Sequence, residues 1–163
     1  MKAPGVGVAA AVLAGERVLL VRRGGPPAAG RWALPGGRLE LGERLEAALK
    51  RELREECALE IEPMGLLELV EAIQPAGTGD GDGYHWLVVT YLARLAGHPP
   101  GAPPPAPRAG DDAREAAWFD PEALKALAPA ETVPGLLALV ERARALRPAP
   151  RDAPAGSCAS REC

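Results

Sequence analysis

The stretch Gly37–Leu59, GRLELGERLEAALKRELREECAL, decides how the rest of the chain is interpreted. Residues 43–57 are good helix formers without glycine or proline, which predicts a helix. At about 100° per residue, Glu52, Glu55 and Glu56 fall within one arc of about 100°. Apolar residues one and two turns earlier occupy the same arc. The helix is therefore predicted to carry its acidic cluster on its apolar face, and not opposite to it.

The acidic cluster has two interpretations. Glutamates three and four residues apart repel by roughly 0.2–0.5 kcal/mol per pair, and the last turn of a helix disfavours anions. Arg51 and Arg54 offset part of this repulsion. A solvated helix face is the common explanation for such a run of charge. A hard divalent cation would remove these objections, because Mg²⁺ binds carboxylate oxygens. The helix alone leaves both interpretations open.

The same stretch resembles the signature of the Nudix hydrolase family, G-x5-E-x7-R-E-U-x-E-E-x-G-U, in which U is apolar. Leu53 and Leu59 fill the apolar places, whereas Ala58 stands where the family has glycine. If that position has a positive φ, alanine costs about 1 kcal/mol there but removes no metal ligand. The matching fixed letters are Gly37, Glu43, Arg51, Glu52, Glu55 and Glu56.

This resemblance implies an α+β protein built as an α/β/α sandwich, with a mixed central sheet and a metal-binding loop–helix–loop. By position, Glu52, Glu55 and Glu56 would be metal ligands, and the backbone carbonyl of Gly36 would be a further one. Glu43 and Arg51 would hold the loop and the helix in register. The implied ion is Mg²⁺, with Mn²⁺ as a substitute.

The rest of the chain predicts a single domain over residues 1–146. A proline- and alanine-rich tail, 147–163, is predicted to be disordered. The proline-rich stretch 98–107 is predicted to be extended. Strands are predicted at 6–13 and 17–23, which form a hairpin, and at 65–73, 84–93 and 115–119. Helices are predicted to follow Asp120, as N-cap, and Pro134.

The general base and the substrate contacts rest on weaker signals. Glu52 is the first choice for the base. Asp112 and Glu115, in GDDAREAAW, come next, and a solvated loop edge is the competing explanation for both. Aromatic side chains stack readily on nucleobases, and guanidinium groups bind phosphates. On this ground the candidate substrate contacts are Tyr84, Trp86, Arg23 and Arg31, with surface solubility as the alternative for the arginines.

Composition excludes several classes. The 163 residues have a net charge of −3, which argues against a general nucleic-acid binder. Three cysteines without a CxxC pair fit a reducing compartment, so a cytoplasmic location is expected. No apolar run is long enough to span a membrane. Cys57 is predicted to be a small buried side chain and His85 an ordinary strand residue.

The resemblance to the Nudix hydrolases implies a Mg²⁺-dependent pyrophosphohydrolase that acts on a small nucleotide. ADP-ribose or another nucleoside diphosphate sugar is the favoured substrate class. The first alternative is a nucleoside triphosphate pyrophosphohydrolase that clears oxidised guanine nucleotides. A non-catalytic nucleotide sensor is the alternative of another class. The sequence leaves a homodimer, formed through the sandwich itself, as an open prediction.

Overall fold

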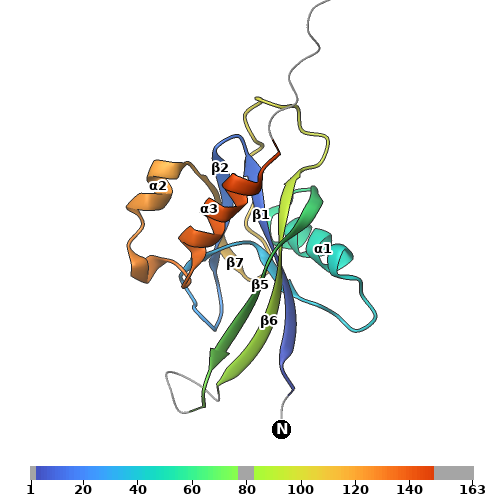
Figure 1. Ribbon diagram of the computed structural model, residues 1–163, viewed down its shortest axis with the longest axis vertical. Helices are drawn as coiled ribbons and strands as arrows, with labels where there is room; N and C mark the ends of the chain where they lie inside the picture. The colour runs from blue at the N-terminus through green and yellow to red at the C-terminus, as the bar shows by residue number, and fades with distance from the viewer. Residues whose placement is uncertain (1–2, 77–82, 149–163) are drawn as a thin grey trace, which may run out of the picture.

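The computed structural model describes residues 3–76 and 83–148 (Figure 1). Strands β1 (Gly5–Ala14) and β2 (Arg17–Arg23) pair antiparallel, which confirms the predicted hairpin. The turn between them contains Gly15 at φ +59°, a conformation in which glycine carries no steric penalty.

The sheet is mixed, as predicted. Its strand order is β3 (Trp32–Ala33), β2, β1, β6 (Tyr84–Leu95) and β5 (Ile61–Gln74). Strand β4 (Gly36–Arg38) pairs with β1, and β7 (Ala113–Phe119) pairs with β2. The β1–β6 pair is parallel, and the other named strand pairs are antiparallel.

Helices cover both faces of the sheet, so the predicted sandwich is confirmed (Figure 1). On one face, α1 (Leu45–Cys57) buries Leu49 and Leu53 against Val8 and its neighbours. On the other face, α3 (Leu136–Leu146) buries side chains against β1, β2 and β5. The short α2 (Pro121–Ala126) begins after Asp120, whose side chain accepts a hydrogen bond from the Ala123 N–H at 2.8 Å, as its predicted N-cap role requires.

Strand β5 begins earlier than predicted, at Ile61, and includes Pro63. The β5–β6 register shifts between Pro63 and Gly65. Because β5 is the last strand of its sheet order, a residue without an N–H is tolerated there. The two- and three-residue strands β3 and β4 were not predicted, because segments of that length show no periodicity.

Two segments fall partly outside the described residues. The sequence predicts a flexible acidic loop at 75–83, of which residues 77–82 are outside, and the predicted tail is outside from residue 149 onward. Arg147, where that tail was predicted to begin, still contacts the β1–β2 turn through an ion pair with Glu16 at 2.7 Å. Among the described residues, no helix combines the length and the apolarity needed to cross a membrane.

Candidate active site

The last turns of α1 bury two of the three clustered glutamates. Glu52 is 7% exposed and Glu56 is 5% exposed, whereas the side chain of Glu55 is 45% exposed. The same helix face buries Leu49 and Leu53 completely, so packing of its apolar arc draws the carboxylates inward. The predicted continuity of the two arcs is confirmed. A solvated face describes Glu55 but not Glu52 or Glu56.

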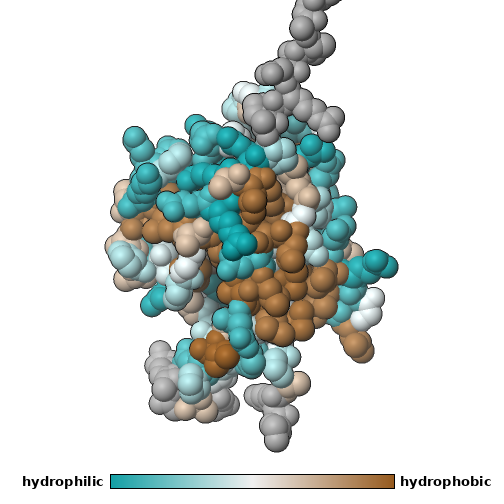
Figure 2. All heavy atoms as spheres, viewed as in Figure 1, coloured by the Kyte–Doolittle hydropathy of each residue, from teal (hydrophilic) through white to brown (hydrophobic). Residues whose placement is uncertain are grey.

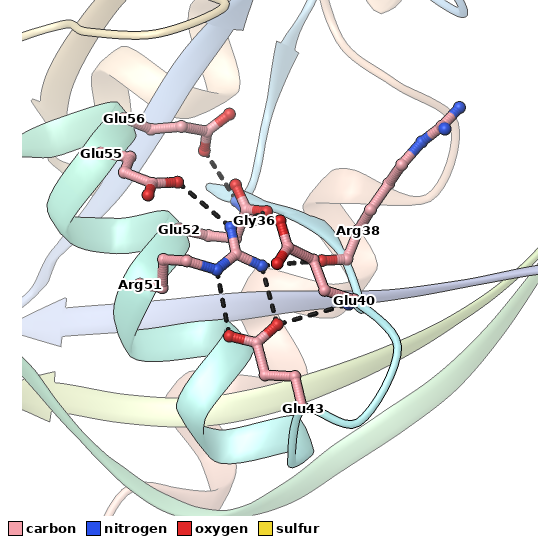
Figure 3. Close-up of polar contacts among 8 residues, drawn as sticks. All are labelled: Gly36, Arg38, Glu40, Glu43, Arg51, Glu52, Glu55 and Glu56. Atoms are coloured by element: carbon pink, nitrogen blue, oxygen red, sulfur yellow. Dashed lines mark hydrogen bonds and ion pairs between the residues drawn. The ribbon is translucent and has the colours of Figure 1, made fainter.

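A glycine pair on β4 lies against these carboxylates. The Gly36 N–H donates a hydrogen bond to Glu56 Oε2 at 2.8 Å (Figure 3). A Cβ atom at Gly37 would lie 2.3 Å from Glu52 Cδ, and one at Gly36 would lie 2.1 Å from the Val8 carbonyl oxygen. Side chains at either position would therefore displace the glutamates or β1. The loop and the helix meet closely because both residues are glycine.

Arg51 ties the helix to the preceding loop, as predicted. Its guanidinium donates to both carboxylate oxygens of Glu43, at 3.0 Å and 2.9 Å. It also donates to Glu52 at 2.8 Å, to Glu55 at 3.1 Å and to the Arg38 carbonyl oxygen at 3.0 Å (Figure 3). The hydrogen bonds to the glutamates raise the pKa of Arg51, and the bond to Glu43 has the largest effect. A single guanidinium thus connects three glutamates and β4.

The other nearby arginine points elsewhere. Arg54 forms its ion pair with Glu60 at 2.7 Å, beyond the end of the helix. Among the described residues, no lysine or arginine forms an ion pair with Glu56. The carboxyl group most deeply buried in the cluster therefore lacks a cationic partner from the described protein.

The loop before β7 brings a fourth carboxylate to the cluster. The Arg108 N–H donates to the Cys57 carbonyl at 2.9 Å, and the Gly110 N–H donates to the Glu56 carbonyl at 3.1 Å. These bonds satisfy carbonyls that the end of α1 leaves unpaired. They also place Asp112 close enough to raise the pKa of Glu56 by its charge and by a hydrogen bond.

Burial dominates the electrostatics of the two inner glutamates. It raises the pKa of Glu56 to about 8, against the opposing hydrogen bond from Gly36. It also raises the pKa of Glu52, against the Arg51 contact, while Glu55 and Asp112 raise it further. Carboxylates buried close together without enough positive charge are the donor set that a divalent cation requires.

The side chains of Glu52, Glu55 and Glu56 do not converge on a single point in this structure. In the part of the chain that the structure describes, no three Asp, Glu, His or Cys side chains are arranged to hold a metal ion. Glu52 and Glu55 turn to Arg51, and Glu56 turns to the Gly36 N–H. Cation binding would therefore exchange these contacts for metal coordination.

The remaining candidates contact other groups. Glu115 pairs with Arg22 at 2.8 Å, and so does not join Asp112. Arg23 donates from Nε to the Pro27 carbonyl at 2.8 Å and bonds through its backbone N–H to the Arg31 carbonyl at 2.9 Å. Both arginines therefore border the loop that connects β2 to β3.

Tyr84 and Trp86 line an open hollow of about 960 Å³ at the N-terminal end of β6. Arg38 lines it too, with its guanidinium carbon 4.9 Å from the centre of the Trp86 ring. Sequence reasoning missed Arg38, although its place directly after Gly37 was a usable signal. In Figure 3 its side chain points away from the glutamates. His85 contacts Glu71 at 2.8 Å, as an ordinary strand residue would.

Helix α1 has its C-cap at Ala58, the residue that stands where the family signature has glycine. Ala58 has φ 55° and ψ 37°, the left-handed conformation that favours glycine. Its N–H donates to the Arg54 carbonyl at 3.0 Å, and the Leu59 N–H donates to the Leu53 carbonyl at 3.4 Å. Cys57, just before it, is buried, and burial raises the pKa of its thiol to about 12, which confirms the prediction of an inert apolar residue.

Comparisons with known proteins agree with this geometry. A family model described as NUDIX domain matches residues 1–142. The chain is 34% identical over 125 residues to an ADP-ribose pyrophosphatase from Methanocaldococcus jannaschii, covering 77% of this chain and 67% of that protein. It is also 34% identical over 104 residues to the human 8-oxo-dGDP phosphatase NUDT18, covering 64% of this chain but only 28% of that protein.

A solved structure gives the same result. The MutT NUDIX hydrolase from Burkholderia pseudomallei superimposes with a TM-score of 0.66 at 31% identity, over 86% of this chain and 98% of that one. The family match, the shared fold and the glutamates at the end of α1 lead to one conclusion. The chain belongs to the Nudix hydrolase family.

Proposed function

We propose that this chain hydrolyses the diphosphate linkage of a nucleoside diphosphate derivative, with a divalent cation bound at the end of α1. The observation that carries the proposal is the burial of Glu52 and Glu56 against Gly36 and Gly37. Burying a carboxylate without a partner is unfavourable, and Glu56 has no ion-pair partner among the described lysines and arginines.

Glu52, Glu55 and Glu56, with the carbonyl oxygen of Gly36, are the groups that would hold the cation. Carboxylate and carbonyl oxygens suit Mg²⁺, and Mn²⁺ is the expected substitute. When bound, such an ion neutralises phosphate charge and lowers the pKa of coordinated water. Arg51 would keep its bidentate contact with Glu43 and so keep the loop next to the helix during turnover.

The reaction needs a proton acceptor. The oxygen of water forms a bond to one phosphorus, and the bond from that phosphorus to the bridging oxygen breaks. A carboxylate takes the proton that the water loses. Glu52 remains the first choice, and Asp112 is second because its loop is fastened to α1 beside Glu56. Glu115 is third, since it would first have to leave Arg22.

ADP-ribose or another nucleoside diphosphate sugar is the proposed substrate class. In support, the alignment with the archaeal ADP-ribose pyrophosphatase covers 67% of that protein, whereas the alignment with NUDT18 covers 28% of it. Tyr84 and Trp86 would stack on the base, and Arg23 and Arg31 would contact phosphate. Hydrolysis of oxidised guanine nucleotides is the second candidate, favoured by the match to NUDT18.

A hydrolysis panel with Mg²⁺ tests the proposal. It should contain ADP-ribose, other nucleoside diphosphate sugars, dinucleoside polyphosphates and oxidised guanine nucleotides. We expect the unmodified protein to cleave ADP-ribose or a related sugar, and the Glu55→Gln/Glu56→Gln variant to lose that activity. Glu46→Gln, in the first turn of the same helix, is the matched control and should retain it.

Two outcomes would contradict the proposal. Unchanged release by the double variant would exclude the proposed cation site. Absence of release from every compound by the folded, unmodified protein would favour the non-catalytic sensor.

A further inference from the structure

Asp112 is held between two elements that are distant from each other in the sequence. On one side, the Gly110 N–H donates to the Glu56 carbonyl of α1 at 3.1 Å. On the other side, the N–H of Gly24, the residue after β2, donates to the Asp112 carbonyl at 2.7 Å. The loop that carries this carboxylate is therefore anchored both to α1 and to the start of the loop that connects β2 to β3.

Both anchors are glycines with no room for a side chain. A Cβ at Gly24 would lie 2.1 Å from the Asp112 carbonyl oxygen, and one at Gly110 would lie 2.5 Å from the Glu55 carbonyl oxygen. Neither glycine lies in the left-handed region, so the backbone conformation does not require glycine at these positions. The close approach of two chain segments does.

Strand β7 has an irregularity at this contact. Its register against β2 shifts between Arg22 and Arg23, which leaves Arg114 as an extra residue on β7. Such a β-bulge bends its strand and changes the direction of neighbouring side chains. The Arg114 guanidinium donates to the Gly24 carbonyl at 3.2 Å, so Gly24 is bound through both its N–H and its carbonyl.

The anchor on the β2 side is itself held in place. The Arg23 N–H donates to the Arg31 carbonyl at 2.9 Å, and the Gly30 N–H donates to the Arg23 carbonyl at 2.7 Å. These bonds close the loop after β2 at its base, directly beside Gly24. A displacement of Asp112 would therefore have to break the contacts of Gly24 or move a closed loop.

This anchoring brings the charge of Asp112 to the inner glutamates. Burial is the main cause that raises the pKa of Glu52 and of Glu56, and the charge of Asp112 adds to it in both. Asp112 itself is exposed, so it is accessible to water beside the buried carboxylates. Groups just outside the ligands of a metal orient those ligands and tune the metal.

We propose that Gly24 is a positioning residue for Asp112, and that Asp112 acts on the cation bound at Glu56. Gly24 has no side chain with which to bind a cation or a substrate. It acts by letting the chain after β2 approach the Asp112 backbone closely. The inference rests on the proposed function, because it assigns a role within the same cation site.

A double-variant cycle tests the proposal, with Mn²⁺ affinity and hydrolysis of the best substrate in the panel as separate measurements. It compares the unmodified protein, Gly24→Ala, Asp112→Asn and the combined variant. We expect each single variant to bind Mn²⁺ roughly tenfold more weakly and to hydrolyse the substrate roughly tenfold more slowly. In the Asp112→Asn background, Gly24→Ala should change either quantity by less than about twofold, because the charge that it positions is already absent.

Gly25→Ala is the matched control, because a Cβ there has no neighbour within 4 Å. It should match the unmodified protein in both measurements. Should Gly24→Ala fail to fold, Arg114→Met takes its place in the cycle, since it removes the bond to the Gly24 carbonyl without adding a side chain at Gly24. Its losses should likewise disappear in the Asp112→Asn background.

Three results would overturn the proposal. They are a folded Gly24→Ala protein that behaves as Gly25→Ala does, equal losses from Gly24→Ala in both backgrounds, and an unchanged Mn²⁺ affinity in Asp112→Asn. If the unmodified protein cleaves no compound, the proposed reaction fails and the Mn²⁺ cycle alone decides this inference. Absence of Mn²⁺ binding to the unmodified protein would overturn both.

Discussion

The end of α1 buries charged side chains, whereas the outer strand β5 exposes apolar ones (Figure 2). At the end of α1, Glu52 and Glu56 are buried among leucines. On β5, Leu69 and its apolar neighbours are exposed. The buried glutamates lack sufficient positive charge, which a cation would supply.

The two regions also differ in how tightly they are built. The glutamates are fixed by Arg51, by the Gly36 N–H and by the loop at Gly110. The exposed side chains of β5 lie on a strand that is paired with β6. Changes at the end of α1 should therefore affect chemistry and stability strongly, whereas changes at the exposed positions of β5 should affect them less.

The largest expected effect is on catalysis. Glu52→Gln removes a charged ligand and the first-choice base while it keeps the side-chain volume. We expect the rate of diphosphate hydrolysis at saturating Mg²⁺ to fall by roughly 10²–10⁴-fold. Steady-state release of the nucleoside monophosphate measures this change. Glu46→Gln should keep its activity within about twofold, and an equal loss in both variants would refute the special role of Glu52.

The next effect is the pH dependence of stability without metal. Glu56 has a pKa of about 8 in the folded protein and an ordinary value of 4.5 when unfolded. Between these values the folded state binds more protons, so its free energy of unfolding falls as the pH rises. We expect a decrease of about 2–4 kcal/mol between pH 4.5 and pH 8, measured by urea unfolding in a metal chelator.

Two comparisons test the assignment of this pH dependence. Glu56→Gln should remove most of it, because glutamine does not titrate, and the raised pKa of Glu52 should leave a remainder. Saturating Mg²⁺ should also flatten it, because the cation favours the charged carboxylate. If Glu56→Gln keeps the full dependence, the responsible group lies elsewhere.

A smaller effect is expected at the glycine that faces Glu52. In Gly37→Ala the new Cβ would lie 2.4 Å from the Glu52 carboxylate oxygens, so this side chain must move. We expect a loss of roughly 10–100-fold in activity and weaker Mg²⁺ activation, as for other groups that orient metal ligands. Gly25→Ala is the control, because a Cβ there has no neighbour within 4 Å. Equal activities for the two variants would contradict the close fit at Gly37.

The smallest effect concerns the end of α1. Ala58 occupies a left-handed conformation at φ 55°, so Ala58→Gly should raise the free energy of unfolding by about 1 kcal/mol. The activity should not change, because Ala58 contributes no ligand. Thermal unfolding measures the stability, and release of the nucleoside monophosphate measures the activity. A destabilised glycine variant would mean that this conformation is not strained.

Much of the site at the end of α1 was predictable from the sequence, because it is formed by residues that lie close together in the chain. The helical arc of α1 predicts Glu52, Glu55 and Glu56 on its apolar face, and the structure buries Glu52 and Glu56 but leaves Glu55 half-exposed. The contact between Asp112 and the cluster was not predictable, because it depends on how the proline-rich stretch returns to the end of α1. Likewise, Arg38 meets Trp86 only because β4 and β6 flank β1.

The second region was harder to predict. Strand β5 carries apolar side chains on both faces, a pattern typical of a strand covered on both sides. The structure buries Ile61 on the α1 side and Leu67 on the α3 side, but leaves Leu69 and Ile73 exposed. How far a helix covers a neighbouring strand is a tertiary property. The sequence therefore identified an apolar strand correctly but not its exposure.

Direct titration with Mn²⁺, followed by the electron paramagnetic resonance signal of the free ion, tests the central claim. The claim is that the buried glutamates of α1 form a divalent cation site. We expect the unmodified protein to bind Mn²⁺, Mg²⁺ to displace it, and Glu56→Gln to bind at least about tenfold more weakly. Equal Mn²⁺ affinity in the folded Glu56→Gln variant and in the unmodified protein would contradict the claim.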